Sequence, residues 1–231
     1  MEKIFVINLD TATDRWSHYK DDKRYTRWSA TCIDDLNVND PIWDKMISYY
    51  NISPHEHSAK CCAYLSHTRL WKYIVTNKLN NVLILEDDAF LVNEIPDPND
   101  LPKDGFSYLG GFTSHLRMTD GHKKVEFKEG INQIDHKEYR MLMCLAIFIP
   151  TWEVAYQMIK SSTRNGRCRA IDTMIRDTFR NQYVYYPACF VERPIQSQIR
   201  DNKKKFSNSQ YEWVNAKKVM EEINLFKINK S

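Results

Sequence analysis

The stretch NVLILEDDAFLV, residues 81–92, decides the fold that we predict. Its four consecutive aliphatic residues, 82–85, are typical of a strand buried on both faces, as in a parallel sheet sandwiched by helices. Three carboxylates, Glu86, Asp87 and Asp88, follow at once, before apolar residues resume. Ligands of open α/β sheets gather beyond the carboxyl ends of such strands, so we expect a binding site at these acids.

The three acids need a compensating partner if they are even partly buried. Because side chains alternate along a strand, Glu86 and Asp88 should point to one side and Asp87 to the other. Adjacent negative charges resist desolvation unless a cation or a donor-rich ligand offsets them, and oxygen ligands suit Mg²⁺ or Mn²⁺. A solvated loop after the strand is the simpler explanation of an acidic triplet. The order of buried strand, acids and renewed apolar run favours a metal–diphosphate site, although other metal-dependent phosphoryl chemistry would also fit.

Length and composition indicate a globular α/β protein. The chain has 231 residues, of which 42% are hydrophobic and 13% aromatic, so there is ample material for a core. A net charge of +3 with dispersed basic residues gives little support for nucleic acid as a partner. We find no repeats and no obvious linker, and we predict one domain over 1–231 with a polar insertion at about 112–137.

Cysteine usage and hydropathy bear on the compartment. The six cysteines form no CxxC pair and no zinc spacing, and several lie in apolar runs, which is typical of reduced thiols. The N-terminus has no signal-peptide pattern and no apolar run reaches 18 residues. We therefore expect a soluble, cytoplasmic protein. In the tail, 207–231, we expect a docked amphipathic helix, with a membrane or partner contact as the alternative.

The N-terminal half contains two further strands and a long helix. Residues 3–9 (KIFVINL) predict the first strand, and the turn after it predicts a helix near Arg15 that Thr13 or Asp14 caps. A loop in this position can hold a nucleotide, and Arg15 could meet a phosphate there; the alternative is an exposed arginine on a surface helix. We also expect a short strand at 25–30 and a helix at 41–50.

The long helix should begin after Ser53, which can act as its N-cap. Pro54 and Glu56 complete the signature of a capping box, and the apolar pattern extends to about residue 77, on more than one stripe. Such a helix is largely buried against a sheet. We assign His67, within it, a mainly structural role.

The C-terminal half should alternate strands and helices. The predicted strands occupy 106–111, with glycines that allow close backbone approach, 140–149, and 183–191 as one strand or two. Thr151 should cap a helix, and a second helix should begin near Ile171, which places Asp172 in its first turn.

Several of these segments together resemble glycosyltransferase family 25. That family includes lipopolysaccharide and collagen galactosyltransferases, with relatives in giant viruses. The matching segments occur in the family's order and span about residues 4–200. They are VINLDTATDRW at 6–16, YLSHTRLW at 64–71, LILEDDAF at 83–90, AIFIPTWEVAYQMI at 146–159, AID at 170–172 and YYPACFVERPIQSQI at 185–199.

The resemblance implies a GT-A-type, Rossmann-like open sheet and a transfer that inverts the anomeric carbon. The implied donor is a UDP-sugar, carrying galactose or glucose, with Mn²⁺ or Mg²⁺ as cofactor. The acceptor would be a hydroxyl of a glycan, of a lipopolysaccharide-like lipid or of a collagen-like hydroxylysine. We assign Glu86 and Asp88 to the metal and Asp172 to the general base, with helix capping as the alternative for Asp172. Donor contacts are assigned to residues of the matching segments and their surroundings: Asn8, Asp10, Arg15, Lys60 and Asp87.

Two departures from the family pattern leave an alternative open. Family sequences often carry a glycine–glutamate pair before the cysteine of the LSH segment, where this chain has Ala59 and Lys60. Near the end, the family's Ser-x-Ile is matched only loosely at 197–199, and no histidine follows His136. A non-catalytic protein that binds nucleotide sugars is therefore the main alternative, and a metal-dependent phosphohydrolase is the second.

Overall fold

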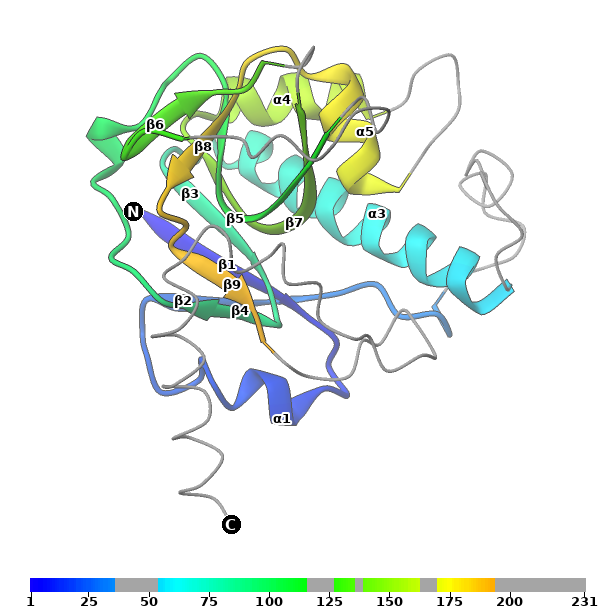
Figure 1. The fold of residues 1–231 in the computed structure, drawn as a ribbon. Coiled ribbons are helices and arrows are strands. Elements are labelled where there is room, and N and C mark those ends of the chain that lie inside the picture. Colours follow the sequence, from blue (N-terminus) through cyan, green and yellow to red (C-terminus); the bar gives the residue numbers. More distant parts are fainter. Residues whose placement is uncertain (36–53, 116–126, 136–138, 163–169, 194–231) are drawn as a thin grey trace.

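The structure is a computed structural model that describes residues 1–35, 54–115, 127–135, 139–162 and 170–193. Within these residues a mixed sheet of nine strands carries three longer helices on one face (Figure 1). The main path of the sheet runs β2-β1-β3-β7-β5-β8-β6. The expected fold class, α/β with a Rossmann-like open sheet in one domain, is confirmed.

The N-terminal strands form the parallel part of the sheet. β1 (Lys3–Asn8) lies between β2 (Tyr25–Ser29) and β3 (Val82–Glu86) and runs parallel to both. The carboxyl ends of the three strands therefore lie at one edge, where Asn8, Ser29 and Glu86 end their strands. Both predicted aliphatic runs become strands because alternate residues fill the core on either side of the sheet.

The C-terminal strands make the sheet mixed. β3 pairs antiparallel with β7 (Tyr139–Ile149), and β7 pairs antiparallel with β5 (Phe106–His115). β8 (Gln182–Tyr186) follows, parallel to β5, and β6 (Gly130–Gln133) forms the edge. β3 is buried on both faces as predicted, but only its β1 side has a parallel neighbour.

Two short strands connect the end of β3 to the C-terminal half. β4 (Ala89–Leu91) pairs antiparallel with β9 (Phe190–Glu192), and β9 joins β5 through Gly110 and Phe190. A Cβ on Gly110 would stand 2.7 Å from the carbonyl oxygen of Phe190. The close backbone approach expected at this glycine is therefore confirmed.

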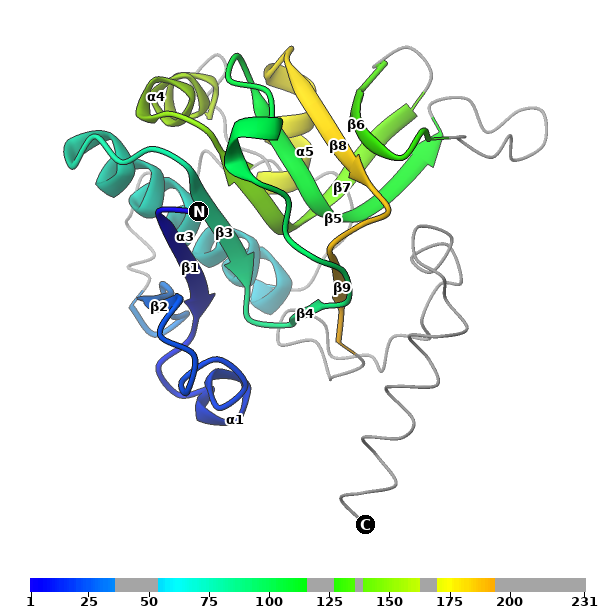
Figure 2. The ribbon, with the colours of Figure 1, turned by 90° about the vertical axis from the view of Figure 1, so that its left-hand side faces the viewer.

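The helical layer covers one face of the sheet (Figure 2). It consists of α3 (Pro54–Thr76), α4 (Trp152–Ser161) and α5 (Ile171–Thr178). Their apolar residues, among them Trp71, Ala155 and Met174, pack on Phe5 and Ile84 of the sheet. Thr151 caps α4 by accepting a hydrogen bond from the Val154 amide at 3.4 Å, as predicted.

The opposite face is covered more thinly within the described residues. Leu83 and Leu85 pack there against Tyr19, which follows the short helix α1 (Thr13–Trp16), and against Leu101, which follows the 3-10 helix η1 (Pro98–Asp100). The helical sandwich is thus asymmetric, with the long helices on the α3 side.

Two local predictions are wrong. The predicted caps Thr13 and Asp14 both lie inside α1, whose N-cap is Ala12, because the amide of Ala12 already closes a turn onto the carbonyl of Leu9. The strand predicted at 106–111 continues to His115, since its backbone pairs with β7 over the whole length. The polar segment 112–137 accordingly contributes the end of β5 and all of β6 to the sheet.

Several predictions fall on residues outside the described ranges. These are the helix at 41–50, the N-cap at Ser53, the centre of the polar segment and the tail at 207–231. The five cysteines that the structure describes are free thiols, in agreement with the sequence.

Candidate active site

The candidate site lies at the carboxyl end of β3, at residues 86–88, which we call the acidic turn. Glu86 is the last residue of β3, Asp87 and Asp88 form a turn, and Ala89 begins β4. Glu86 faces His67 of α3, whereas Asp87 faces Asn8 and Arg15. The two side chains therefore point to opposite sides, as the alternation predicts.

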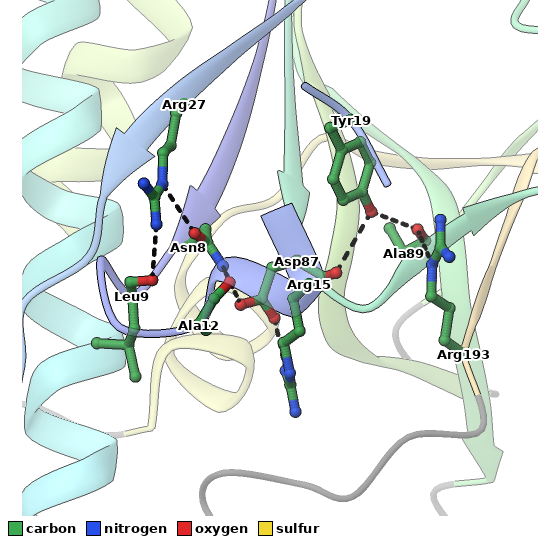
Figure 3. Close-up of polar contacts among 9 residues, drawn as sticks. All are labelled: Asn8, Leu9, Ala12, Arg15, Tyr19, Arg27, Asp87, Ala89 and Arg193. Carbon is green, nitrogen blue, oxygen red and sulfur yellow. Dashed lines mark hydrogen bonds and ion pairs between the residues drawn. The ribbon is translucent and has the colours of Figure 1, made fainter. Parts of the chain in front are cut away.

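Asp87 is fixed by a buried ion pair. The Arg15 guanidinium Nη1 lies 2.6 Å from Asp87 Oδ1, and the two side chains are only 8% and 10% exposed (Figure 3). Asn8 Nδ2 donates to the other oxygen, Oδ2, at 2.8 Å. The alternative of an exposed Arg15 is thus wrong, and α1 brings this arginine to the acidic turn.

Asn8 supports the ion pair between Arg15 and Asp87. It is buried at the end of β1, and its amide nitrogen also donates to the carbonyl of Ala12 at 3.1 Å. Its amide oxygen accepts from Arg27 Nε at 2.8 Å. Both amide hydrogens and the oxygen are thus engaged within the protein, so Asn8 supports Asp87 and the α1 turn.

Two residues that the sequence did not single out hold the backbone of the acidic turn. The hydroxyl of Tyr19 donates to the carbonyl of Ala89 and lies 3.5 Å from that of Asp87. The Arg193 amide donates to the carbonyl of Asp88 at 2.7 Å, and its Nε donates to Ala89 at 3.3 Å (Figure 3). The Arg193 guanidinium also lies over the ring of Tyr19, 5.6 Å from its centroid.

These contacts with the backbone of the acidic turn could not be predicted from the sequence. Tyr19 lies in a polar loop with no periodic pattern, and Arg193 follows β9, more than 100 positions from the turn that it contacts. Burial raises the pKa of the Tyr19 phenol, which is therefore a neutral donor at physiological pH. Burial lowers the pKa of the Arg193 guanidinium, although the charge of Asp88 opposes that effect.

Asp88 carries a buried oxygen, Oδ1, to which no described residue donates a hydrogen bond. Burial, together with the charges of Glu86, Glu192 and Asp87, raises the pKa of the Asp88 carboxyl well above its usual value. An ionised carboxylate in such surroundings is stabilised by a cation.

A pocket opens beside the acidic turn, between the ends of β1 and β3 and the first half of α3. Its cavity volume is about 170 Å³, smaller than the roughly 300–1,000 Å³ of a pocket that encloses a whole drug-sized ligand. It is lined by both apolar and polar residues: Ile7, Leu9, Arg15, Ala30, Thr31, Ile33, Ala59, Cys62, Ala63, Ser66, His67, Glu86, Asp87 and Asp88. It can therefore hold one part of a larger ligand.

The acids fit a cation that takes the rest of its ligands from a substrate. Within the described part of the chain, no three His, Cys, Asp or Glu side chains converge as a ready-made metal cage. Mg²⁺ is commonly held by one or two carboxylates plus substrate phosphates, and Mn²⁺ accepts the same hard oxygen ligands. Asp88, with its unpartnered Oδ1, and the neighbouring Glu86 match that pattern, whereas Asp87 is already paired with Arg15.

The other predicted site residues are not part of the pocket lining. Asp10 is exposed and accepts from the Ser29 hydroxyl at 2.6 Å, and Lys60 lies on α3 next to Ala59. Neither lines the pocket. Asp172 is in the first turn of α5, as predicted, where its Oδ1 accepts from the Thr173 amide at 2.6 Å.

The charges of Asp172 and Glu86 nevertheless act on the same buried thiol. Burial, together with the negative charges of both carboxylates, raises the pKa of Cys144 on β7 well above its usual value. Asp172 does not line the pocket, so any contact with a substrate would have to come from a ligand that extends beyond it.

An open, Rossmann-like sheet with an acidic turn at the carboxyl end of a strand, beside a pocket, has its polar groups where α/β proteins bind their ligands. The family model of glycosyltransferase family 25 (LPS biosynthesis protein) matches residues 1–118, about half of the chain. The chain therefore belongs to glycosyltransferase family 25. The match covers β1 to β5 and includes the acidic turn, Arg15 and His67, but not Asp172 or Arg193.

Two negative findings complete the comparison. No curated protein matches the chain. None of the helices in the described ranges combines the length and the apolar character that a bilayer crossing requires.

Proposed function

We propose that this glycosyltransferase moves a hexose, galactose or glucose, from a UDP-sugar to a hydroxyl acceptor, with inversion and with Mn²⁺ or Mg²⁺. The observation that carries the proposal is the buried, unpartnered Oδ1 of Asp88 at the end of β3. Two further carboxylates adjoin Asp88. The turn is therefore suited to bind a cation, and the cation can in turn bind a diphosphate.

The residues of the turn have separate tasks in this proposal. Asp88 and Glu86 hold the cation, which when bound stabilises the negative charge on the departing diphosphate. Arg15 and Asn8 keep Asp87 in place, and Tyr19 and Arg193 fix the carbonyls of the turn. Asp87 and the backbone of the turn are thereby held in position before the donor arrives, so less ordering is needed when it binds.

The base that deprotonates the acceptor is proposed to be Asp172. Single displacement needs a group that removes the hydroxyl proton as the attack proceeds. Asp172 is half-buried, and its charge acts on the Cys144 thiol together with that of Glu86. Its hydrogen bonds to Thr173 fit helix capping equally well, so a variant has to decide between the two roles.

The test is release of UDP from UDP-galactose and UDP-glucose, with Mn²⁺ or with EDTA. Asp88→Asn keeps the size of the side chain and removes its charge, and we expect a loss of about 10²–10³-fold in kcat, typical for removal of one transition-state contact. Asp100→Asn, on the exposed turn of η1, is the matched control and should leave the rate unchanged. Metal-independent turnover would remove the role given to Asp88.

The same assay separates the alternatives. Binding of a UDP-sugar with Mn²⁺ but without hydrolysis or transfer would indicate the non-catalytic binding protein. Release of inorganic phosphate from simple esters would indicate a phosphohydrolase. Full activity of Asp172→Asn would assign Asp172 to helix capping and leave the base to another residue.

A further inference from the structure

The surroundings of His67 indicate a functional role rather than a purely structural one. It lies on α3, is 2% exposed and borders the pocket. Its Nδ1 is buried and has no hydrogen-bond partner among the described residues. Buried polar groups with a structural role are nearly always hydrogen-bonded, because an unpaired one is costly.

The other ring nitrogen faces the acidic turn. His67 Nε2 lies 3.6 Å from Glu86 Oε1, which is too long for a hydrogen bond and short enough that a small side-chain rotation would make one. The two partners differ in freedom, because the Glu86 side chain is 32% exposed and the His67 side chain only 2%. Glu86 is therefore the partner that can move.

The tautomer follows from the same contacts. A neutral imidazole carries one N–H donor and one acceptor nitrogen. With no partner at Nδ1, the proton is best placed on Nε2, where it points at a carboxylate. In this tautomer the ring can donate a hydrogen bond from Nε2 to the Glu86 carboxylate.

We propose that His67 is a positioning residue for Glu86, and that its Nε2–H holds the Glu86 carboxylate against the pocket when the cation and the diphosphate bind. The inference rests on the proposed function, since it concerns how the same site retains its cation. It replaces the mainly structural role that the sequence predicts for His67.

The expected size of the effect comes from comparable arrangements. A side chain that orients a metal-ligating group through a hydrogen bond typically changes metal affinity by about 10–100-fold when it is removed. We expect a change of that size in the apparent Mn²⁺ affinity at a fixed UDP concentration. A residue that only filled space would change the stability of the fold and leave this affinity unaltered.

Three substitutions separate the two roles. His67→Phe keeps a planar ring without a donor, His67→Gln places an amide N–H near the position of Nε2, and His67→Asn places one nearer Nδ1. We expect His67→Phe and His67→Asn to weaken Mn²⁺ binding by about 10–100-fold, and His67→Gln to restore it to within a few-fold. Isothermal titration of the full chain with Mn²⁺ and UDP gives the affinities, and melting temperatures check that each variant folds. Lys72→Gln, exposed on the same helix, is the control.

A double-mutant cycle tests whether His67 acts through Glu86. If it does, His67→Phe should cause little further loss of Mn²⁺ affinity in a protein that already carries Glu86→Gln. The effects of the two substitutions on this affinity will then not be additive. Additive effects, or wild-type affinity in His67→Phe, would overturn the inference while the proposed function stands. If the wild-type chain binds no Mn²⁺ with UDP, both fail. If His67→Phe does not fold, the comparison of His67→Gln with His67→Asn decides.

Discussion

The buried ion pair between Arg15 and Asp87 gives the sharpest test of how this site is held together. We consider Arg15→Met, which keeps the length of the side chain and removes the charge. The substitution leaves the Asp87 carboxylate buried beside the pocket, with Asn8 Nδ2 at 2.8 Å as the donor that remains among the described residues. An uncompensated buried charge is costly, so the variant should be less stable than the wild type.

The magnitude follows from the burial of the pair. Removing one partner of a buried ion pair costs about 3–5 kcal/mol. Since Asn8 still donates to Oδ2, we expect the lower end of that range, about 3 kcal/mol. For a chain of this size 1 kcal/mol corresponds to about 2–4 °C, so the melting temperature should fall by about 6–12 °C.

The molecule contains a matched control for burial. Arg24 Nη2 and Asp22 Oδ2 are also 2.6 Å apart, but those side chains are 61% and 37% exposed. Exposed pairs contribute little, because water and salt screen the charges. Arg24→Met should therefore give no measurable change in the urea midpoint.

Urea unfolding and differential scanning calorimetry of the two variants provide the assay. The double variant Arg15→Met/Asp87→Leu should recover most of the lost stability, because both charges are then gone. If Arg15→Met costs no more than Arg24→Met, the claim that burial makes the first pair matter is refuted.

Other predictions concern stability at three places. Because the pKa of Asp88 is raised in the folded state, ionising it opposes folding: the stability of the metal-free protein should fall as pH rises from about the ordinary value of 3.8 to the raised one. Asp88→Asn should lack this pH dependence and should melt at a higher temperature than the wild type at pH 7. Calorimetry of both proteins across this pH range is the measurement, and parallel dependences of melting temperature on pH would contradict the prediction. Gly110→Ala forces a Cβ against the Phe190 carbonyl and should lower the urea-derived stability by about 1–3 kcal/mol, an effect that is absent if β5 and β9 can separate freely. Thr151→Ala removes the acceptor of the Val154 amide and should cost about 1 kcal/mol, whereas Thr151→Ser should retain most of it.

Local sequence patterns predicted the parts of the fold that depend on local chemistry. The aliphatic run at 82–85 became β3 because it fits only a position between two covered faces. Thr151 became an N-cap because its oxygen serves a free amide of the next turn. The prediction of a site at the acidic turn rests on the same kind of local reasoning, since the order of the acids along the chain requires no knowledge of distant contacts.

Contacts between segments that are distant in the sequence could not be predicted from local patterns. Arg15 is 72 positions from Asp87, so its burial could not be inferred from the polar turn in which it lies. The length of β5 depends on backbone pairing with β7, which side-chain patterns do not record. For His67, the decisive facts are an unpartnered nitrogen and the position of Glu86, and both exist only in the folded chain.

The order of strands has a consequence for synthesis of the protein on the ribosome. β3 needs β7 as its second neighbour, and Leu85 and its partner Ala146 are about 60 residues apart. At roughly 5–20 residues per second, the nascent chain exposes one open edge of this apolar strand for about 3–12 s. Ala146 also lies beyond the half of the chain that the family model matches. A fragment that ended with the matched residues, at 118, would lack β7 and would leave the edge of β3 permanently unpaired. We expect such a fragment to need chaperones rather than to fold independently.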